Sequence, residues 1–180
     1  GLDYFTLGNH DFNFGYEALE DFLGAMRGQC LCANVQDLGG RLPLKPWAVH
    51  TLANGLRVGV TGIVTDYVNV WEQPQNLEQL RVTDAFEAAR AAREALRPLC
   101  DVCVCIYHGG FEEELATGRL LSDSGENVAC RMARELDFDL LLTGHQHMAV
   151  EGVRLANAWA VQPPANAGVC LLVEGRREGE

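Results

Sequence analysis

Short apolar segments alternate with one-faced helical patterns along this 180-residue chain. Runs rich in Val, Ile, Leu and aromatic residues predict strands, and apolar residues spaced by three and four predict helices. The predicted strands are residues 2–7, 30–35, 47–52, 57–64, 101–107, 139–143, 148–155, 159–162 and 169–174. The predicted helices are residues 16–26, 83–97 (capped by Thr83) and 126–136, with loops at residues 65–80 and 111–125. This alternation predicts an α/β fold, and the Asn54-Gly55 hairpin signal indicates a mixed sheet.

Composition limits the partners of this chain. With 48% hydrophobic residues, residues 1–180 can form one core and therefore one domain. No apolar run approaches the ~18 residues of a membrane span. The net charge of −11 argues against a nucleic-acid polymer as partner, because such partners require clustered Lys and Arg. An anionic substrate would need another attraction, and a metal centre would supply it.

Seven cysteines form an odd set, which is more typical of small buried hydrophobes in a reducing compartment than of a disulfide framework. Cys100 and Cys103 form a CxxC, but no second CxxC completes a zinc ribbon, so a structural role is favoured. The cysteines thus suggest a cytoplasmic location. The first residue is not Met and residues 1–180 contain no signal-peptide pattern, so we expect no localisation signal to be readable from them.

Ligand-type side chains follow three of the predicted strands. Asn9 and His10 come after the first strand, His108 after the strand at 101–107, and His145 and His147 after the strand at 139–143. Open α/β sheets place ligand sites at the carboxyl ends of their strands, so these groups can converge. Imidazoles suit Zn, Fe, Mn or Ni, and an amide oxygen suits the harder metals. The Gly-Asn pair before His10 is also ordinary turn material, which needs no function.

Three blocks carry a family resemblance: GNHD at 8–11, YHGG at 107–110 and GHQH at 144–147, each behind an apolar strand and in this order. They resemble the third to fifth conserved blocks of the calcineurin-like metallophosphoesterases. The longer strings TLGNHDFNFG, YHGGFEEELATG and ENVACRMARELDFDLLLTGHQH are similar to the bacterial 5′-nucleotidase and 2′,3′-cyclic-nucleotide 2′-phosphodiesterase branch. The resemblance implies an αββα sandwich with mixed sheets.

The resemblance also implies a two-metal phosphoester hydrolase that acts on nucleotides. Its cofactors would be two divalent ions, drawn from Mn, Zn, Fe and Co, that clamp the phosphate and activate the attacking water. The implied metal ligands are Asn9, His108 and His145 for one ion and His147 for the other.

The catalytic candidates are His10, Asp11 and Asn13, with His10 assisting the leaving group. Many 5′-nucleotidases carry Asp where this chain has Asn13, which cannot stabilise an imidazolium by charge; this favours the cyclic phosphodiesterase side. Gly109 and Gly110 are candidate substrate-binding residues, because glycine permits close backbone approach to a phosphate or to a neighbouring strand.

Two parts of the family pattern are missing. The blocks Asp-x-His and Gly-Asp, which supply the bridging carboxylate, would precede Gly8, and only seven residues do. The carboxy-terminal nucleotide-recognition domain is missing too. We therefore expect an N-terminally truncated, partial catalytic domain of a longer parent chain, inactive in isolation. The alternative is a non-catalytic module that keeps one metal for structure or partner binding. Relatives of this branch are often exported to the periplasm or cell surface, which conflicts with the cysteines.

Overall fold

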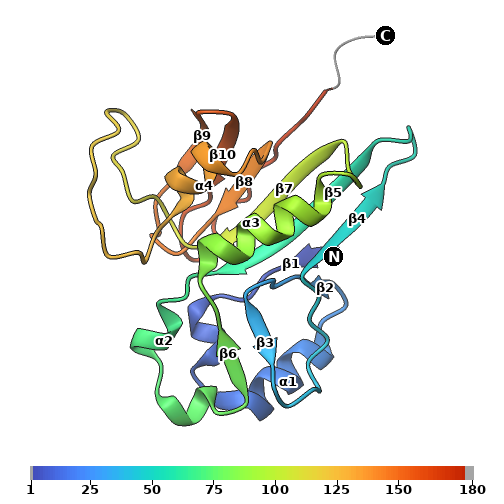
Figure 1. Ribbon diagram of the computed structural model, residues 1–180, viewed down its shortest axis with the longest axis vertical. Coiled ribbons are helices and arrows are strands. Elements are labelled where there is room, and N and C mark those ends of the chain that lie inside the picture. The colour runs from blue at the N-terminus through green and yellow to red at the C-terminus, as the bar shows by residue number, and fades with distance from the viewer. Residues whose placement is uncertain (1, 177–180) are drawn as a thin grey trace.

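A six-stranded mixed sheet forms the centre of the computed structural model, which describes residues 2–176 (Figure 1). The strand order is β4-β5-β7-β8-β10-β9. The neighbours β5–β7, β7–β8 and β8–β10 are parallel, whereas β4 and β9 pair antiparallel at the two edges. These strands are β4 (Trp47–Thr51), β5 (Arg57–Val64), β7 (Val102–His108), β8 (Leu140–Thr143), β9 (Val150–Leu155) and β10 (Ala158–Gln162). The expected α/β fold with a mixed sheet is confirmed.

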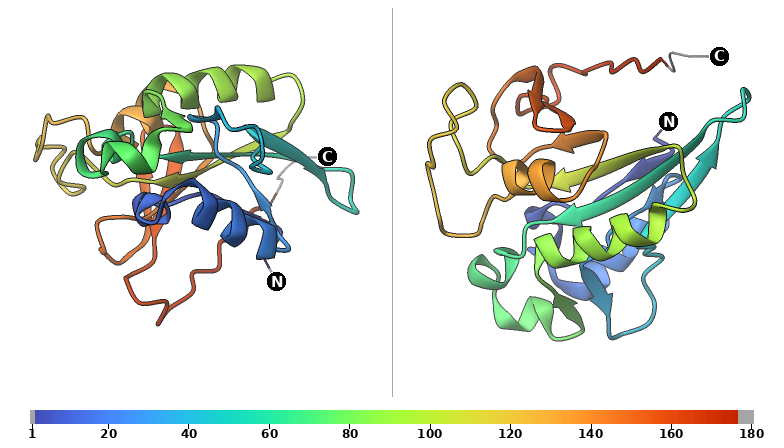
Figure 2. Two further views of the ribbon diagram at one scale, coloured as in Figure 1. Left: turned by 90° about the horizontal axis from the view of Figure 1, so that it is seen from below. Right: turned by 45° about the horizontal axis from the view of Figure 1, so that its top comes forward.

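Helices α3 (Ala85–Leu96) and α4 (Ala129–Glu135) lie on one side of this sheet, and α1 (Gly15–Ala25) lies on the other (Figure 2). The principal core fills the space between the sheet and helices α3 and α4. Ala89 and Leu96 of α3 and Met132 of α4 are fully buried there against Cys105 and Leu141. Their spacing along each helix places them on a single face, as the periodicity predicts.

A second core lies under α1, between the six-stranded sheet and two small sheets. In the small sheets β1 (Tyr4–Phe5) pairs with β2 (Gln29–Cys30) and β3 (Val35–Asp37) pairs with β6 (Leu80–Val82). Leu7, Phe12 and Leu19 are almost fully buried in this core. Phe12 ends the 3₁₀ helix η1 (Asn9–Phe12), so its burial fixes the turn that follows β1.

The predicted strand at 30–35 is divided into β2 and the start of β3. The cause is the buried side chain of Asn34, whose Nδ2 donates to Val64 O at 2.7 Å and whose Oδ1 accepts from Val64 N at 3.0 Å. The Asn34 side chain thus bonds to the N–H and C=O groups of Val64, which a neighbouring strand would otherwise pair with. The predicted loop at 65–80 contains the short helices α2 (Val68–Trp71) and η2 (Pro74–Leu77).

Two further predictions about elements were wrong. Asp84, not Thr83, caps α3: its Oδ1 accepts from Glu87 N at 2.7 Å, while Thr83 Oγ1 bonds to Asn34 O. Residues 169–174 form no strand in the described chain, and Leu172 within them is 85% exposed. Apolar alternation alone is insufficient there, because a strand also needs a paired edge.

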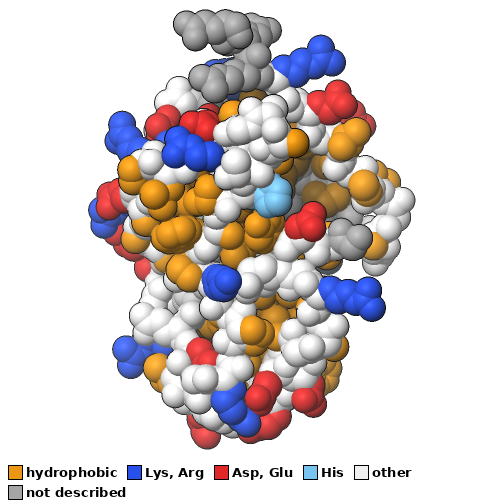
Figure 3. Space-filling view, turned by 90° about the vertical axis from the view of Figure 1, so that its right-hand side faces the viewer, with side chains coloured by type: hydrophobic (Ala, Val, Ile, Leu, Met, Phe, Trp, Pro, Cys, Tyr) orange, Lys and Arg blue, Asp and Glu red, His pale blue; other side chains and the backbone are white. Residues whose placement is uncertain are grey.

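Exposed hydrophobic side chains gather on the side of the molecule where β4 lies (Figure 3). Within residues 2–176, no helix is long and apolar enough to cross a membrane.

Candidate functional site

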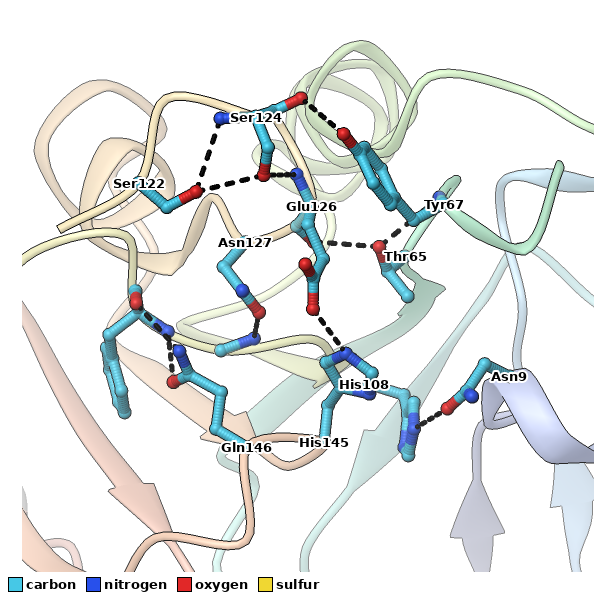
Figure 4. Close-up of polar contacts among 12 residues, drawn as sticks. Asn9, Thr65, Tyr67, His108, Ser122, Ser124, Glu126, Asn127, His145 and Gln146 are labelled. Carbon is cyan, nitrogen blue, oxygen red and sulfur yellow. Dashed lines mark hydrogen bonds and ion pairs between the residues drawn. The ribbon is translucent and has the colours of Figure 1, made fainter. Parts of the chain in front are cut away.

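The candidate site lies where the ends of β7 and β8 meet the turn after β1 (Figure 4). His108 is the last residue of β7, and His145 follows β8 by two residues. Tyr107 pairs with Thr143 in the parallel ladder, so the two strands end at the same level. Asn9 begins η1, which is separated from β1 by residues 6–8, and approaches from the other side. The topology thus brings together side chains that are far apart in the sequence, with 99 positions between Asn9 and His108.

Asn9, His108 and His145 form the centre of this site. Asn9 Oδ1 lies 2.9 Å from His108 Nε2, and the His108 and His145 rings are 5.4 Å apart in an edge-to-face arrangement. Gly8 lets the His108 ring approach, because a Cβ at position 8 would lie 3.0 Å from its Cε1. His108 Nε2 faces Asn9, and a Cβ at Gly144 would lie 3.6 Å from the other ring nitrogen, Nδ1.

The environment keeps His108 uncharged. Burial, together with the smaller effects of neighbouring His145, His10 and His147, lowers the pKa of His108 to about 4. Three other histidines therefore lie within electrostatic range of His108. A neutral imidazole is the form that binds a metal ion.

The GHQH turn is held by its glutamine. Gln146 Nε2 donates to Phe111 O at 2.9 Å, and Gln146 Oε1 accepts from Phe111 N at 2.7 Å. His145 and His147, on either side, have φ values of 71° and 57°, in the left-handed region that non-glycine residues rarely adopt. His147 is exposed, and the hydrogen bonds of the described residues do not join it to Asn9 or His108.

The three catalytic candidates lie in and beside η1. Asn13 Nδ2 lies 3.1 Å from His10 Nδ1, so Asn13 donates to the ring instead of accepting from it, and the His10 proton is on Nε2. Asp11 Oδ2 accepts from Gly8 N at 2.7 Å and closes the start of η1. Burial raises the pKa of Asp11. Asp11 therefore has a structural partner, whereas His10 is exposed.

Both candidate substrate-binding glycines are needed for internal packing. A Cβ on Gly109 would lie 2.1 Å from the Tyr107 ring, and one on Gly110 would lie 2.1 Å from Gln146 Oε1. Glycine at these positions could allow close approach either to a phosphate or to neighbouring protein. The structure shows close approach to the side chains of Tyr107 and Gln146.

Three residues near the site were missed or misjudged from the sequence. Glu126 Oε1 lies 2.9 Å from His145 Nε2, and Trp71 stacks on the His145 ring at 5.4 Å and 30°. Glu112 belongs to the predicted loop at 111–125, yet it is 7% exposed and its carboxylate accepts from the N–H groups of Cys130 and Arg131 at the start of α4. The pattern of a single sequence does not reveal contacts between residues this far apart in the chain.

A cavity of about 470 Å³ opens beside the histidines. Its walls come from η1, α2 and η2 and include His10, Asn13, Trp71 and His145. Amide, imidazole and indole groups thus surround one space next to the exposed His10.

The residues of the centre fit one metal ion. Two neighbouring donors on a metal with bonds of about 2.1 Å lie roughly 3.0–3.4 Å apart, and Asn9 Oδ1 and His108 Nε2 are 2.9 Å apart. Among residues 2–176, however, no three His, Cys, Asp or Glu side chains converge on one point, because an amide takes the third place. Of the predicted ligands, only His147 is left for a second ion.

Comparison with known proteins agrees with this geometry. The calcineurin-like phosphoesterase family model matches residues 2–149. The trifunctional nucleotide phosphoesterase YfkN of Bacillus subtilis is 30% identical over 79% of this chain and 10% of its own length. The 2′,3′-cyclic-nucleotide 2′-phosphodiesterase/3′-nucleotidase of Salmonella typhimurium is 25% identical over 87% of this chain and 25% of its own length.

Solved structures agree as well. A Staphylococcus aureus protein provisionally described as a 5′-nucleotidase, crystallised with α-ketoglutarate, superimposes with a TM-score of 0.83 at 33% identity. The match covers 91% of this chain and 32% of that protein. The chain thus spans only about a tenth to a quarter of the curated relatives reported above. The expected metallophosphoesterase fold is confirmed, and the chain belongs to the calcineurin-like phosphoesterase family.

Proposed function

We propose that this chain is part of the catalytic domain of a phosphoester hydrolase that acts on nucleotides. The observation that carries the proposal is the convergence of Asn9, His108 and His145 beside a cavity that His10 also lines. Family membership supports the reaction class, and the names of the relatives support 5′-nucleotides, 3′-nucleotides or 2′,3′-cyclic nucleotides as substrates.

Asn9, His108 and His145 are proposed to hold one metal ion, and His147 to contribute to a second. Calcineurin-like phosphoesterases are generally dinuclear metal enzymes. Such ions, when bound, neutralise phosphate charge and lower the pKa of a water. The low pKa of His108, about 4, supports its proposed role as a metal ligand. At neutral pH the ring is uncharged, so it need not release a proton before its nitrogen binds a metal ion.

His10 is proposed to protonate the leaving oxygen. In the neutral ring, Nδ1 accepts from the Asn13 amide and Nε2 carries the hydrogen. To act as an acid the ring must first be protonated, with the Asn13 amide oxygen turned toward Nδ1–H, and the imidazolium then gives its Nε2 proton to the leaving oxygen and returns to the neutral form. Because His10 lines the cavity, a nucleoside leaving group in that space would lie within its reach. Trp71 and the amide side chains of the same cavity offer a surface for the nucleoside part, through stacking and hydrogen bonds. Asp11 acts by holding η1, and hence His10, in place.

The experiment is His10→Ala in the complete gene product, with phosphate release measured from 5′-AMP and from 2′,3′-cyclic AMP. His50→Ala is the matched control, because His50 is exposed on β4 away from the site. We expect His10→Ala to lose about 10²–10⁴-fold in kcat while binding Mn²⁺ as the unchanged protein does. Full activity in His10→Ala would refute the role of His10, and an inactive unchanged protein would refute the reaction.

A non-catalytic module with a single metal is the second candidate. It is favoured by one observation, namely that the described residues supply three donors for one ion and only His147 for another. A single-metal module needs Asn9 and His108 but not His10. Calorimetric titration with Mn²⁺ separates the candidates: two ions per complete protein support the hydrolase, and one ion with no phosphate release supports the module.

A further inference from the structure

The segment that contains Glu126 is fixed at the edge of the site by its backbone. Glu126 O accepts from Thr65 Oγ1 at 2.7 Å and from Tyr107 Oη at 3.3 Å. Thr65, which Figure 4 shows bonded to Glu126, directly follows β5, and Tyr107 lies in β7, so groups at the ends of two neighbouring strands hold this residue. The next residue, Asn127, accepts from Gly110 N at 2.7 Å. The backbone that carries the Glu126 carboxylate is therefore held in place by hydrogen bonds.

This carboxylate meets one edge of the His145 ring. Glu126 Oε1 lies 2.9 Å from His145 Nε2, and the two side chains are 30% and 14% exposed. One face of the ring is covered by Trp71, and His108 meets the ring edge-to-face. The His145 ring is thus contacted on three sides, which restricts its rotation.

The contact determines which nitrogen carries the hydrogen. An ionised carboxylate can only accept, so His145 Nε2 must donate. A neutral imidazole has one N–H, and its Nδ1 then holds the lone pair. Glu126 does not itself join His108 and His145 in a three-donor cluster within the described chain. It therefore acts on the outer edge of the His145 ring rather than as a common ligand.

We propose that Glu126 is a positioning residue that fixes His145 as the Nε2–H tautomer, so that Nδ1 is the atom offered to a metal ion shared with Asn9 and His108. Histidine ligands of metals usually donate their second N–H to a carboxylate or carbonyl in this way. The inference rests on the proposed function for the existence of the metal ion, but the tautomer itself does not depend on it.

The first test measures the tautomer in the absence of metal and substrate. Two-bond ¹H–¹⁵N spectra of the ¹⁵N-histidine-labelled complete protein, recorded above about pH 8 where an ordinary imidazole is neutral, report which nitrogen is protonated. His145→Gln identifies the His145 signals. We expect protonated Nε2 in the unchanged protein and in Glu126→Gln, whose amide oxygen can still accept, and a mixture of tautomers in Glu126→Ala.

The second test measures Mn²⁺ affinity by calorimetry. We expect Glu126→Ala to weaken binding by about 10–100-fold and Glu126→Gln by less. Glu114→Gln is the control, because the half-buried Glu114 pairs with Arg119 and Thr117 instead of a histidine.

The results separate this inference from the proposed function. A protonated Nδ1 in the unchanged protein would overturn the inference, as would a Glu126→Ala variant with unaltered tautomer and Mn²⁺ affinity. The expected tautomers and affinities without any phosphate release would instead overturn the proposed function alone. Because Glu126→Gln keeps the size of the side chain, it remains informative if Glu126→Ala fails to fold.

Discussion

Replacing Gln146 with Leu should loosen the turn that carries His145 and His147. The Gln146 amide makes two hydrogen bonds to the backbone of Phe111, at 2.7 and 2.9 Å, and Leu makes neither. Phe111 is 2% exposed, so its N–H and C=O have little access to water. The two histidines already have unfavourable positive φ values, which the amide helps to maintain.

The magnitude follows from the two unpaired groups. A buried donor or acceptor left without a partner costs about 1–3 kcal/mol. Gln146 itself is only half-buried, so water can reach part of the vacated space. We therefore expect Gln146→Leu to lower the free energy of unfolding by about 2–4 kcal/mol, measured by urea titration of the metal-free protein with circular dichroism.

The matched control is Gln75→Leu. Gln75 is exposed and bonds only to the side chain of Gln73 among the contacts described, so the change should fall within about 0.5 kcal/mol. Mn²⁺ affinity should fall in Gln146→Leu and not in Gln75→Leu, because only the first variant releases the histidines. Equal stability of the two variants would refute the reasoning.

Three other variants or conditions test neighbouring parts of the site. Asn13→Asp should shift the basic limb of the pH–rate profile to higher pH, because a carboxylate beside His10 Nδ1 favours the protonated ring; an unchanged profile would remove Asn13 from the mechanism. Glu112→Gln should cost about 1.5–3 kcal/mol in urea unfolding, since its carboxylate accepts from two N–H groups at the start of α4 and an amide oxygen replaces only one acceptor; Glu114→Gln should cost almost nothing, and equal losses would contradict this. The contribution of His108 to the stability of the metal-free protein should be fully present above about pH 6.5 and fall by up to about 3 kcal/mol toward pH 4, because the unfolded chain protonates His108 at its ordinary pKa while burial lowers the folded pKa to about 4; in His108→Gln this part of the pH dependence should disappear.

The sequence predicted the elements whose signal is local. The bounds of β5 agree with the prediction at both ends, because its run of Val, Ile and Gly is bounded by turn residues. α1 and α3 differ from the predicted helices by one or two residues at each end, since their apolar residues share one face. Where a local signal had no partner strand, as at 169–174, the prediction failed.

The sequence also located the candidate site, because His108 and His145 stand at the ends of apolar strands. Parallel strands bring such ends together whatever the details of packing. The roles of His10, Asn9 and His147 came from the family resemblance and remain proposals. The direction of the Asn13 hydrogen bond could not be predicted, since an amide can donate or accept equally well.

What the sequence determined by itself is therefore the α/β alternation and the order of the three polar motifs, because both depend on residues close together in the chain. Only the tertiary structure decided that Glu126 meets His145, that Glu112 is buried at the start of α4, and that Gln146 joins two motifs. Each of these pairs is separated by more than fifteen residues. The sequence alone does not tell whether a carboxylate or amide forms hydrogen bonds with water or with a group distant in the chain. The partner is determined only when the chain folds.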